Sequence, residues 1–155
     1  MHLIGHLQSN KVAKAIDLYN TIQSVDSLKI LNKINKIAKI KNKKQKIFLQ
    51  INISKTPTQT GLKKTEVLDI AQTATQLKNI FLEGVMVIGE NTQEKKIIME
   101  NFYKTQQIQK QIQKQINQNC RYISMGMSQD YILALQAGAT HLRLGTILFA
   151  RRHEK

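Results

Sequence analysis

Apolar runs rich in β-branched residues alternate with amphipathic stretches along this chain, and no other feature restricts its fold as strongly. Each run has the length of a strand, and the segment after it has helical spacing of its apolar residues. The expected strands cover residues 3–5, 21–25, 47–53 and 84–88, with two more inside residues 122–151. Such alternation is typical of a parallel sheet joined by helical crossovers.

The segments between the strands have the periodicity of crossover helices. In the second of them, the apolar residues form one stripe: Leu28, Leu31, Ile34, Ile37 and Ala38. The expected helices cover residues 10–19, 28–38, 65–77 and 93–119, with Thr65 as an N-cap, and a charged loop covers residues 41–46. The longest helix contains Gln-Ile-Gln-Lys repeats, but its apolar stripe is too short to require a coiled-coil partner.

Length and composition indicate one domain. A chain of 155 residues with 41% apolar residues can bury a core, but it is short for an eight-unit barrel, which needs about 200 residues or more. No apolar run approaches the roughly 18–20 residues of a membrane span, and the N-terminus lacks a signal-peptide pattern. Cys120 is the only cysteine, so no internal disulfide is possible and a reducing cytoplasm is expected.

The chain is strongly basic. It has 24 Lys and Arg residues against 10 Asp and Glu residues, a formal net charge of +14. Such a charge suits nucleic acid or an anionic membrane. However, four Tyr, four Phe and no Trp leave few rings to stack on bases. We therefore favour solvated, lysine-rich faces, and a basic RNA-binding module over residues 29–46 stays as an alternative.

Residues 122–151 are the most informative segment, and they indicate a strand, a polar turn, a short helix and another strand. Ser128 stands where a helix N-cap belongs, Asp130 lies in the first turn, and Gly138 ends the helix. The free backbone N–H groups at the start of such a helix attract anions, above all phosphate. Gly126 and Met127 precede Ser128 and would form part of the same turn.

A second turn of small residues follows the last strand. Gly145 lets the backbone approach an anion closely, and Thr146 adds a hydroxyl donor. Two such turns at the ends of neighbouring strands would form a cup for one phosphate group. Arg143 lies just before the second turn, inside a buried strand, where an arginine is costly unless it is paired. It is either a ligand contact or half of a structural ion pair.

Several motifs in order give the chain a family resemblance. Ser-Met-Gly-Met-Ser-x-Asp (residues 124–130) and Arg-x-Gly-Thr-x-x-Phe (residues 143–149) resemble the closing motifs of YggS-like pyridoxal-phosphate homeostasis proteins. These are single-domain relatives of the alanine racemase barrel domain. Residues 2–11, at the start of the chain, are similar to the His-x-Ile-Gly-x-x-Gln-x-Asn-Lys segment of that family. Three further segments agree with the family in order and rough spacing: residues 22–27, 50–54 and 84–89. The resemblance covers nearly the whole chain.

The resemblance implies a parallel (β/α) TIM-type barrel of the alanine racemase N-terminal type that binds pyridoxal 5′-phosphate (PLP). The implied role is buffering and delivery of this cofactor without catalysis, since a racemase needs a second domain that supplies an opposing base. In racemase-type barrels an arginine near the place of Arg143 faces the pyridine nitrogen. The expected cofactor-binding residues are Gly126, Met127, Ser128, Arg143, Gly145, Thr146, Ile4 and Asn10.

One departure from the family concerns the start of the chain. Family members begin with two further strand–helix units, and the first carries the lysine that forms an imine with the cofactor aldehyde. Met1 stands immediately before the third strand, so residues 1–155 are expected to form one incomplete barrel domain of about six strands, strands three to eight. Lys11 belongs to the opening motif and does not replace the imine lysine. A fragment, a split or decayed gene, and a mis-assigned start all stay open.

An incomplete barrel has two open strand edges, which invite pairing or aggregation. We therefore expect poor behaviour of the isolated chain, or rescue by a partner that carries the missing units; enzymes that use PLP are the other expected partners. A sugar-phosphate enzyme on the same barrel stays as a further alternative. The histidines and the lone cysteine lack metal-ligand spacing, so no metal is expected.

Overall fold

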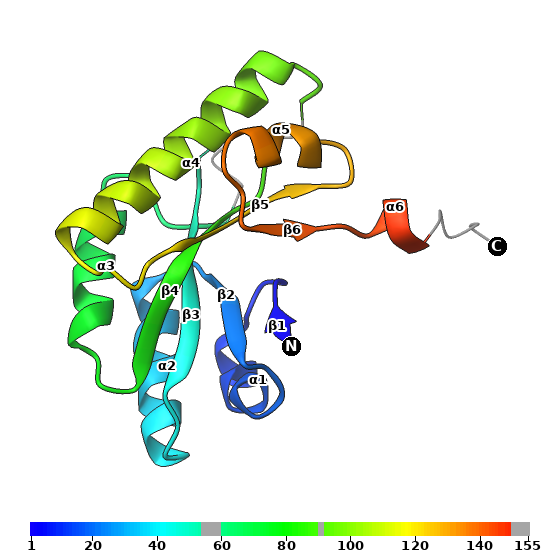
Figure 1. Cartoon of the computed structure of the whole chain (residues 1–155). Coiled ribbons are helices and arrows are strands. Elements are labelled where there is room, and N and C mark those ends of the chain that lie inside the picture. The colour runs from blue at the N-terminus through cyan, green and yellow to red at the C-terminus, as the bar shows by residue number, and fades with distance from the viewer. Residues whose placement is uncertain (54–59, 90–91, 150–155) are drawn as a thin grey trace.

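The computed structural model describes residues 1–53, 60–89 and 92–149, and its strands form a single parallel sheet. The six strands follow chain order across the sheet, and every neighbouring pair is parallel. The strands are β1 (His2–Leu3), β2 (Thr21–Val25), β3 (Gln45–Ile51), β4 (Ile80–Val87), β5 (Tyr122–Met127) and β6 (His141–Arg143). The sheet curls into a half-barrel (Figure 1), and the predicted incomplete α/β barrel is therefore confirmed.

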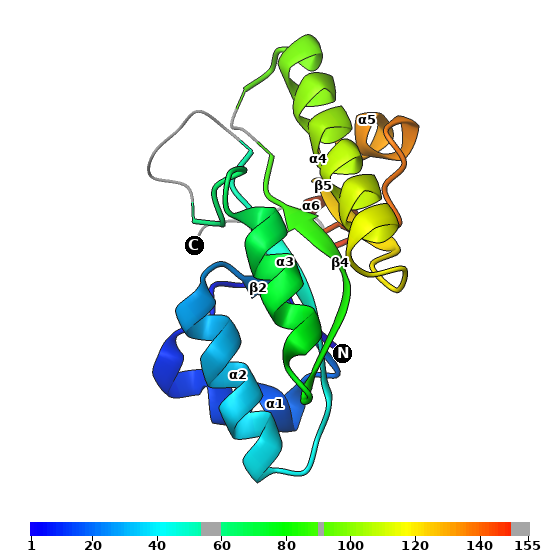
Figure 2. The ribbon, with the colours of Figure 1, turned by 90° about the vertical axis from the view of Figure 1, so that its left-hand side faces the viewer.

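Most of the helices cover the outer face of the curled sheet. The helical segments are η1 (Ser9–Lys11), α1 (Val12–Leu18), α2 (Leu28–Ile40), α3 (Val67–Gln76), α4 (Lys95–Gln115), α5 (Tyr131–Gln136) and α6 (Thr146–Phe149). Helix α6 buries no residue and projects away from the sheet (Figure 1). Figure 2 looks onto α3, with α2 below it and α4 above it. No helix in the described part of the chain is long and apolar enough to cross a membrane.

The main core lies between the sheet and these helices. Each strand from β2 to β5 contributes apolar residues that are almost fully buried, among them Ile22, Leu49, Val85 and Ile123. Because helices cover one face and the curled sheet shields much of the other, the strands are apolar along most of their length.

Helix α2 shows how the predicted apolar stripe seats a helix on the sheet. The hydroxyl of Ser27 accepts a hydrogen bond from the Ile30 N–H at 3.3 Å and caps the first turn. Leu31 and Ile34 have no exposed surface, whereas Leu28, at the start of the stripe, is 44% exposed. The stripe is thus confirmed apart from its first residue.

Some element boundaries differ from the prediction. Strand β3 begins at Gln45, so the charged loop is shorter than residues 41–46. The polar side chain of Gln45 is tolerated inside because its amide donates to the carbonyl groups of Tyr19 and Asn20. Thr65 is not the cap of α3: Glu66 is the N-cap residue, and its carboxylate accepts the Lys63 N–H at 3.0 Å. The loop around Pro57 lies outside the described residues.

The inner face of the sheet is more polar than the outer one. Met86 on β4 is in register with both Gln50 on β3 and Ser124 on β5, so these three side chains share one face. Gln50 and Ser124 are nevertheless almost fully buried. Buried polar groups need hydrogen-bond partners, so the concave side of the half-barrel is where a polar site can be built.

Candidate functional site

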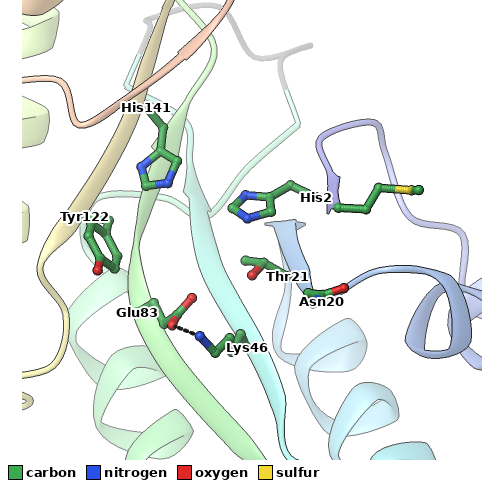
Figure 3. Close-up of a pocket in the computed structure, with 8 residues that line it drawn as sticks. His2, Asn20, Thr21, Lys46, Glu83, Tyr122 and His141 are labelled. Atoms are coloured by element: carbon green, nitrogen blue, oxygen red, sulfur yellow. Dashed lines mark ion pairs between the residues drawn. The ribbon is translucent and has the colours of Figure 1, made fainter.

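In the described part of the chain, two pockets lie at opposite ends of the strands. One, of about 360 Å³, lies where the strands begin, and Figure 3 shows its lining side chains, which include His2, Tyr122 and His141. The other, of about 980 Å³, lies where β4, β5 and β6 end, and it is lined by residues that follow these strands. In parallel barrels the ligand sites lie at the carboxyl ends of the strands. The larger pocket is therefore the candidate site.

Ser128 joins the two predicted turns at this pocket. Its hydroxyl oxygen accepts the backbone N–H of Gly145 at 3.3 Å and that of Ile147 at 3.4 Å. Ser128, Gly145 and Thr146 all line the same pocket. The predicted cap of α5 is wrong, because Asp130 is the N-cap residue there and its carboxylate accepts the Met127 N–H at 2.6 Å.

The geometry at Gly145 leaves room for an anion. The two N–H groups bound to Ser128 make long hydrogen bonds, since typical N–H···O distances are about 2.7–3.2 Å. A Cβ atom built on Gly145 would have no heavy atom within 4 Å, so the space beside this backbone is open. Thr146 lines the same pocket. Weakly engaged donors around open space fit the oxygens of a phosphate group.

Arg143 is fixed by two neutral partners. One guanidinium nitrogen donates to the Val87 carbonyl at 2.7 Å, and the other donates to the Ser124 hydroxyl at 2.9 Å. Burial lowers the pKa of Arg143 below its ordinary value, while nearby Asp130 acts in the opposite direction. Among the described residues no carboxylate lies within salt-bridge distance of Arg143. A contact between the charge of Arg143 and a ligand stays a prediction.

Among the described residues, two further charged ones line the pocket, Lys95 and Asp130, and neither was predicted to do so. Lys95 lies at the start of α4, and Asp130 places a carboxylate near the cup, where it disfavours an anion. The first turn of α4 holds Lys95 and Lys96 but no acidic residue. Cations are unfavourable at the positive end of a helix dipole. The pair of lysines at the start of α4 is therefore unusual, and it was the feature of the sequence that could have indicated a role for Lys95 at the site.

The predicted site residues fall into two groups. Met127, Ser128, Arg143, Gly145 and Thr146 line one pocket. The other three are not among its described lining residues: Gly126, Ile4 and Asn10. Gly126 is buried just before this pocket, whereas Ile4 and Asn10 are exposed near the start of the chain. Ligand contacts of all eight residues stay predictions.

The smaller pocket contains an ion pair and two imidazoles that lie side by side at a tilt of 30°. Lys46 and Glu83 are 2.8 Å apart, and Figure 3 shows this pair below the rings of His2 and His141. The two ring centroids are 5.7 Å apart. Burial lowers the pKa of both imidazoles, and Glu83 opposes this effect at each.

Metal-ligating side chains and the thiol of Cys120 are the other reactive groups of the chain. Within residues 1–53, 60–89 and 92–149 there is no group of three or more His, Cys, Asp or Glu residues that could hold a metal ion. Cys120 is fully buried, and burial raises the pKa of its thiol to about 12, so the thiolate that would react is disfavoured.

Sequence comparison identifies relatives over nearly the whole chain. The family profile described as "Alanine racemase, N-terminal domain" matches residues 1–152. The chain is 37% identical to the pyridoxal phosphate homeostasis protein of Synechocystis, covering 97% of this chain and 69% of that protein. It is 36% identical to the protein of the same name from Helicobacter pylori, covering 96% and 65%. The chain spans 64% of the Vibrio alginolyticus relative and 66% of the Aquifex aeolicus relative.

Solved structures agree in fold. A protein from Bifidobacterium adolescentis matches with a TM-score of 0.93 and 34% identity over 96% of this chain and 60% of that one. PipY of Synechococcus elongatus with PLP bound matches with a TM-score of 0.88 and 32% identity over 96% and 69%. Alanine racemase of Clostridium difficile, at 20% identity and a TM-score of 0.73 over 99% and 40%, shares the fold.

Proposed function

The chain belongs to the family of alanine racemase N-terminal domains, in the branch of pyridoxal phosphate homeostasis proteins, and we propose from this that it binds PLP. The observation that carries the proposal is the hydroxyl of Ser128. It lies against the N–H groups of Gly145 and Ile147, in a pocket that Arg143 also lines. Donor groups suited to a phosphate and a cation suited to the ring thus line one pocket at the carboxyl ends of the strands, which supports the proposal.

Different residues of the pocket contact the phosphate and the ring of the ligand. Ser128, Gly145 and Thr146 hold the phosphate, because their N–H and hydroxyl groups are donors beside open space. Arg143 faces the ring and supplies positive charge, and Met127 offers an apolar surface to it. The bound cofactor supplies a reactive aldehyde.

The biological role that follows is non-catalytic. The protein holds PLP in a reducing cytoplasm and releases it to enzymes that use it, in line with the names of its relatives. A chain that supplies further barrel units is a second proposed partner, because β1 and β6 are the edge strands of the described sheet.

The test is a comparison of PLP with pyridoxal, which lacks the phosphate, by equilibrium dialysis. We expect stoichiometric binding of PLP and weak binding of pyridoxal. Ser128→Ala and Thr146→Val should each weaken PLP binding by about tenfold or more, since hydrogen bonds to charged groups contribute about 1.5–3 kcal/mol. Affinity for pyridoxal should not change.

A matched control is Thr75→Val. Thr75 is exposed on α3 and its hydroxyl donates only to the Gln72 carbonyl, away from the pocket. This variant should bind PLP like the parent chain. Undiminished binding in both cup variants would mean that the phosphate lies elsewhere, and the proposal would be abandoned.

A further inference from the structure

We propose that Gln23 and Ser124 are positioning residues for Arg143: a line of hydrogen bonds across the inside of the half-barrel fixes the guanidinium at the candidate site. The inference rests on the proposed function, since it concerns how the ring-facing cation of that site is held. Neither residue lines the pocket. Both act through Arg143.

The line of hydrogen bonds is short and buried. Arg143 donates to the Ser124 hydroxyl at 2.9 Å, and that hydroxyl donates to the Gln23 side-chain carbonyl at 2.7 Å. The Gln23 amide nitrogen lies 2.8 Å from Nδ1 of His2. Ser124 has no exposed surface and Gln23 is 2% exposed. Such closely spaced polar groups away from water strengthen one another.

The line connects parts of the sheet that are not neighbours. Gln23 is on β2 and Ser124 is on β5, and β3 and β4 separate them in the sheet. Their side chains meet only because the sheet curls, so they bridge its concave side. At its ends the line reaches β6 through Arg143 and β1 through His2.

The direction of every hydrogen bond is determined by the arginine. A guanidinium can only donate, so the Ser124 oxygen accepts and its single proton goes to the Gln23 carbonyl oxygen. The amide nitrogen of Gln23 then faces His2 as a donor, which requires an unprotonated Nδ1. The line therefore selects the neutral His2 tautomer with its proton on Nε2.

The same logic predicts what the loss of one hydroxyl does. In Ser124→Ala, Arg143 loses one of its two anchors and keeps the Val87 carbonyl. Gln23 also loses the donor that orients its amide, so the amide can rotate and present its oxygen to His2. Ser124→Thr retains the hydroxyl and should retain the line.

The first experiment needs no ligand. Nitrogen NMR of the imidazoles should show His2 of the parent chain with its proton on Nε2. Ser124→Ala should shift His2 toward the Nδ1–H tautomer, and Ser124→Thr should restore the parent spectrum. An unchanged His2 tautomer in Ser124→Ala would overturn the inference, whether or not the chain binds PLP. Melting curves of both variants establish that they are folded.

The second experiment compares PLP with inorganic phosphate. Ser124→Ala should weaken PLP binding about tenfold and change the absorbance of the bound ring, because Arg143 is no longer held, while phosphate binding at the cup is unaffected. Ser124→Thr should rescue both effects. Equal losses for PLP and phosphate, or no loss for PLP, would contradict the positioning role. Absence of PLP binding to the parent chain would instead contradict the proposed function, and the NMR result would still decide the inference.

Discussion

Gly126 has a packing role that depends on no ligand. Its φ of +90° lies in the region that favours glycine, and a Cβ atom built on it would lie 2.5 Å from the Cβ of Ala134. A methyl group there would strain the backbone and push α5 away from β5. The glycine predicted to lie at the cofactor site is thus already required by the fold.

Gly126→Ala should lower the free energy of unfolding by about 2–4 kcal/mol, the sum of backbone strain and overpacking. The measurement is the urea midpoint, with the slope of the transition checked for constancy. Gly5→Ala is the control, because its Cβ would have no heavy atom within 4 Å, and its midpoint should stay close to that of the parent. Equal midpoints for both variants would show that α5 moves aside without cost.

At the level of an element, the first turn of α4 contributes a charged side chain to the candidate pocket. Lys95 lines the candidate pocket, and the adjacent Lys96 does not. Both are exposed and lie in the same first turn. Lys95→Gln should therefore weaken PLP binding about two- to fivefold, the effect of one exposed charge, whereas Lys96→Gln should not.

Isothermal titration at low and high salt tests this pair. The difference between the two variants should shrink as salt rises, because salt screens exposed charges. Equal effects of the two substitutions would mean that only the net charge of the helix matters and that Lys95 has no place at the ligand.

Strands were easier to predict than the groups that surround the site. The limits of β2 agree with the prediction, because a β-prone run lies between polar residues. The start of β3 was missed, because Gln45 is polar and only its contacts with distant carbonyl groups keep it inside. Local sequence likewise placed Ser128 at the start of a helix, but it could not show which helix. The Ser128 hydroxyl accepts N–H groups just before and within α6, and not those of α5.

The partnership of Gln23 with Ser124 was not predictable from local sequence at all. The two residues are 101 positions apart, and they meet only through the curl of the whole sheet. The two turns of the cup could be proposed from sequence because each motif is local, and the family resemblance supplied their order. Contacts across the barrel interior depend instead on closure and register, which periodicity does not encode.

At the level of the whole molecule, the curl of the sheet brings one imidazole from the first strand close to one from the last strand. The imidazoles of His2 on β1 and His141 on β6 lie with their centroids 5.7 Å apart and their planes tilted by 30°. Phe48 and Tyr122 stand edge-on to His141, at 5.5 Å and 5.2 Å. Burial lowers the pKa of both histidines, and each also experiences other charges: the amino terminus, Lys46 and Glu83 act on His2, and His2 and Glu83 act on His141.

This arrangement predicts a molecule that loses stability in mild acid. An unfolded histidine titrates near pH 6.5. Because the folded pKa values lie lower, the unfolded chain binds protons first as the pH falls below about 6.5, and the equilibrium shifts toward it. The melting temperature should be constant above that pH and fall between pH 6.5 and 5.5. His141→Phe keeps an aromatic ring beside Phe48 and removes one titrating group, so it should remove roughly half of this decline. A variant that declines as steeply as the parent chain would show that the titration of His141 does not contribute to the decline.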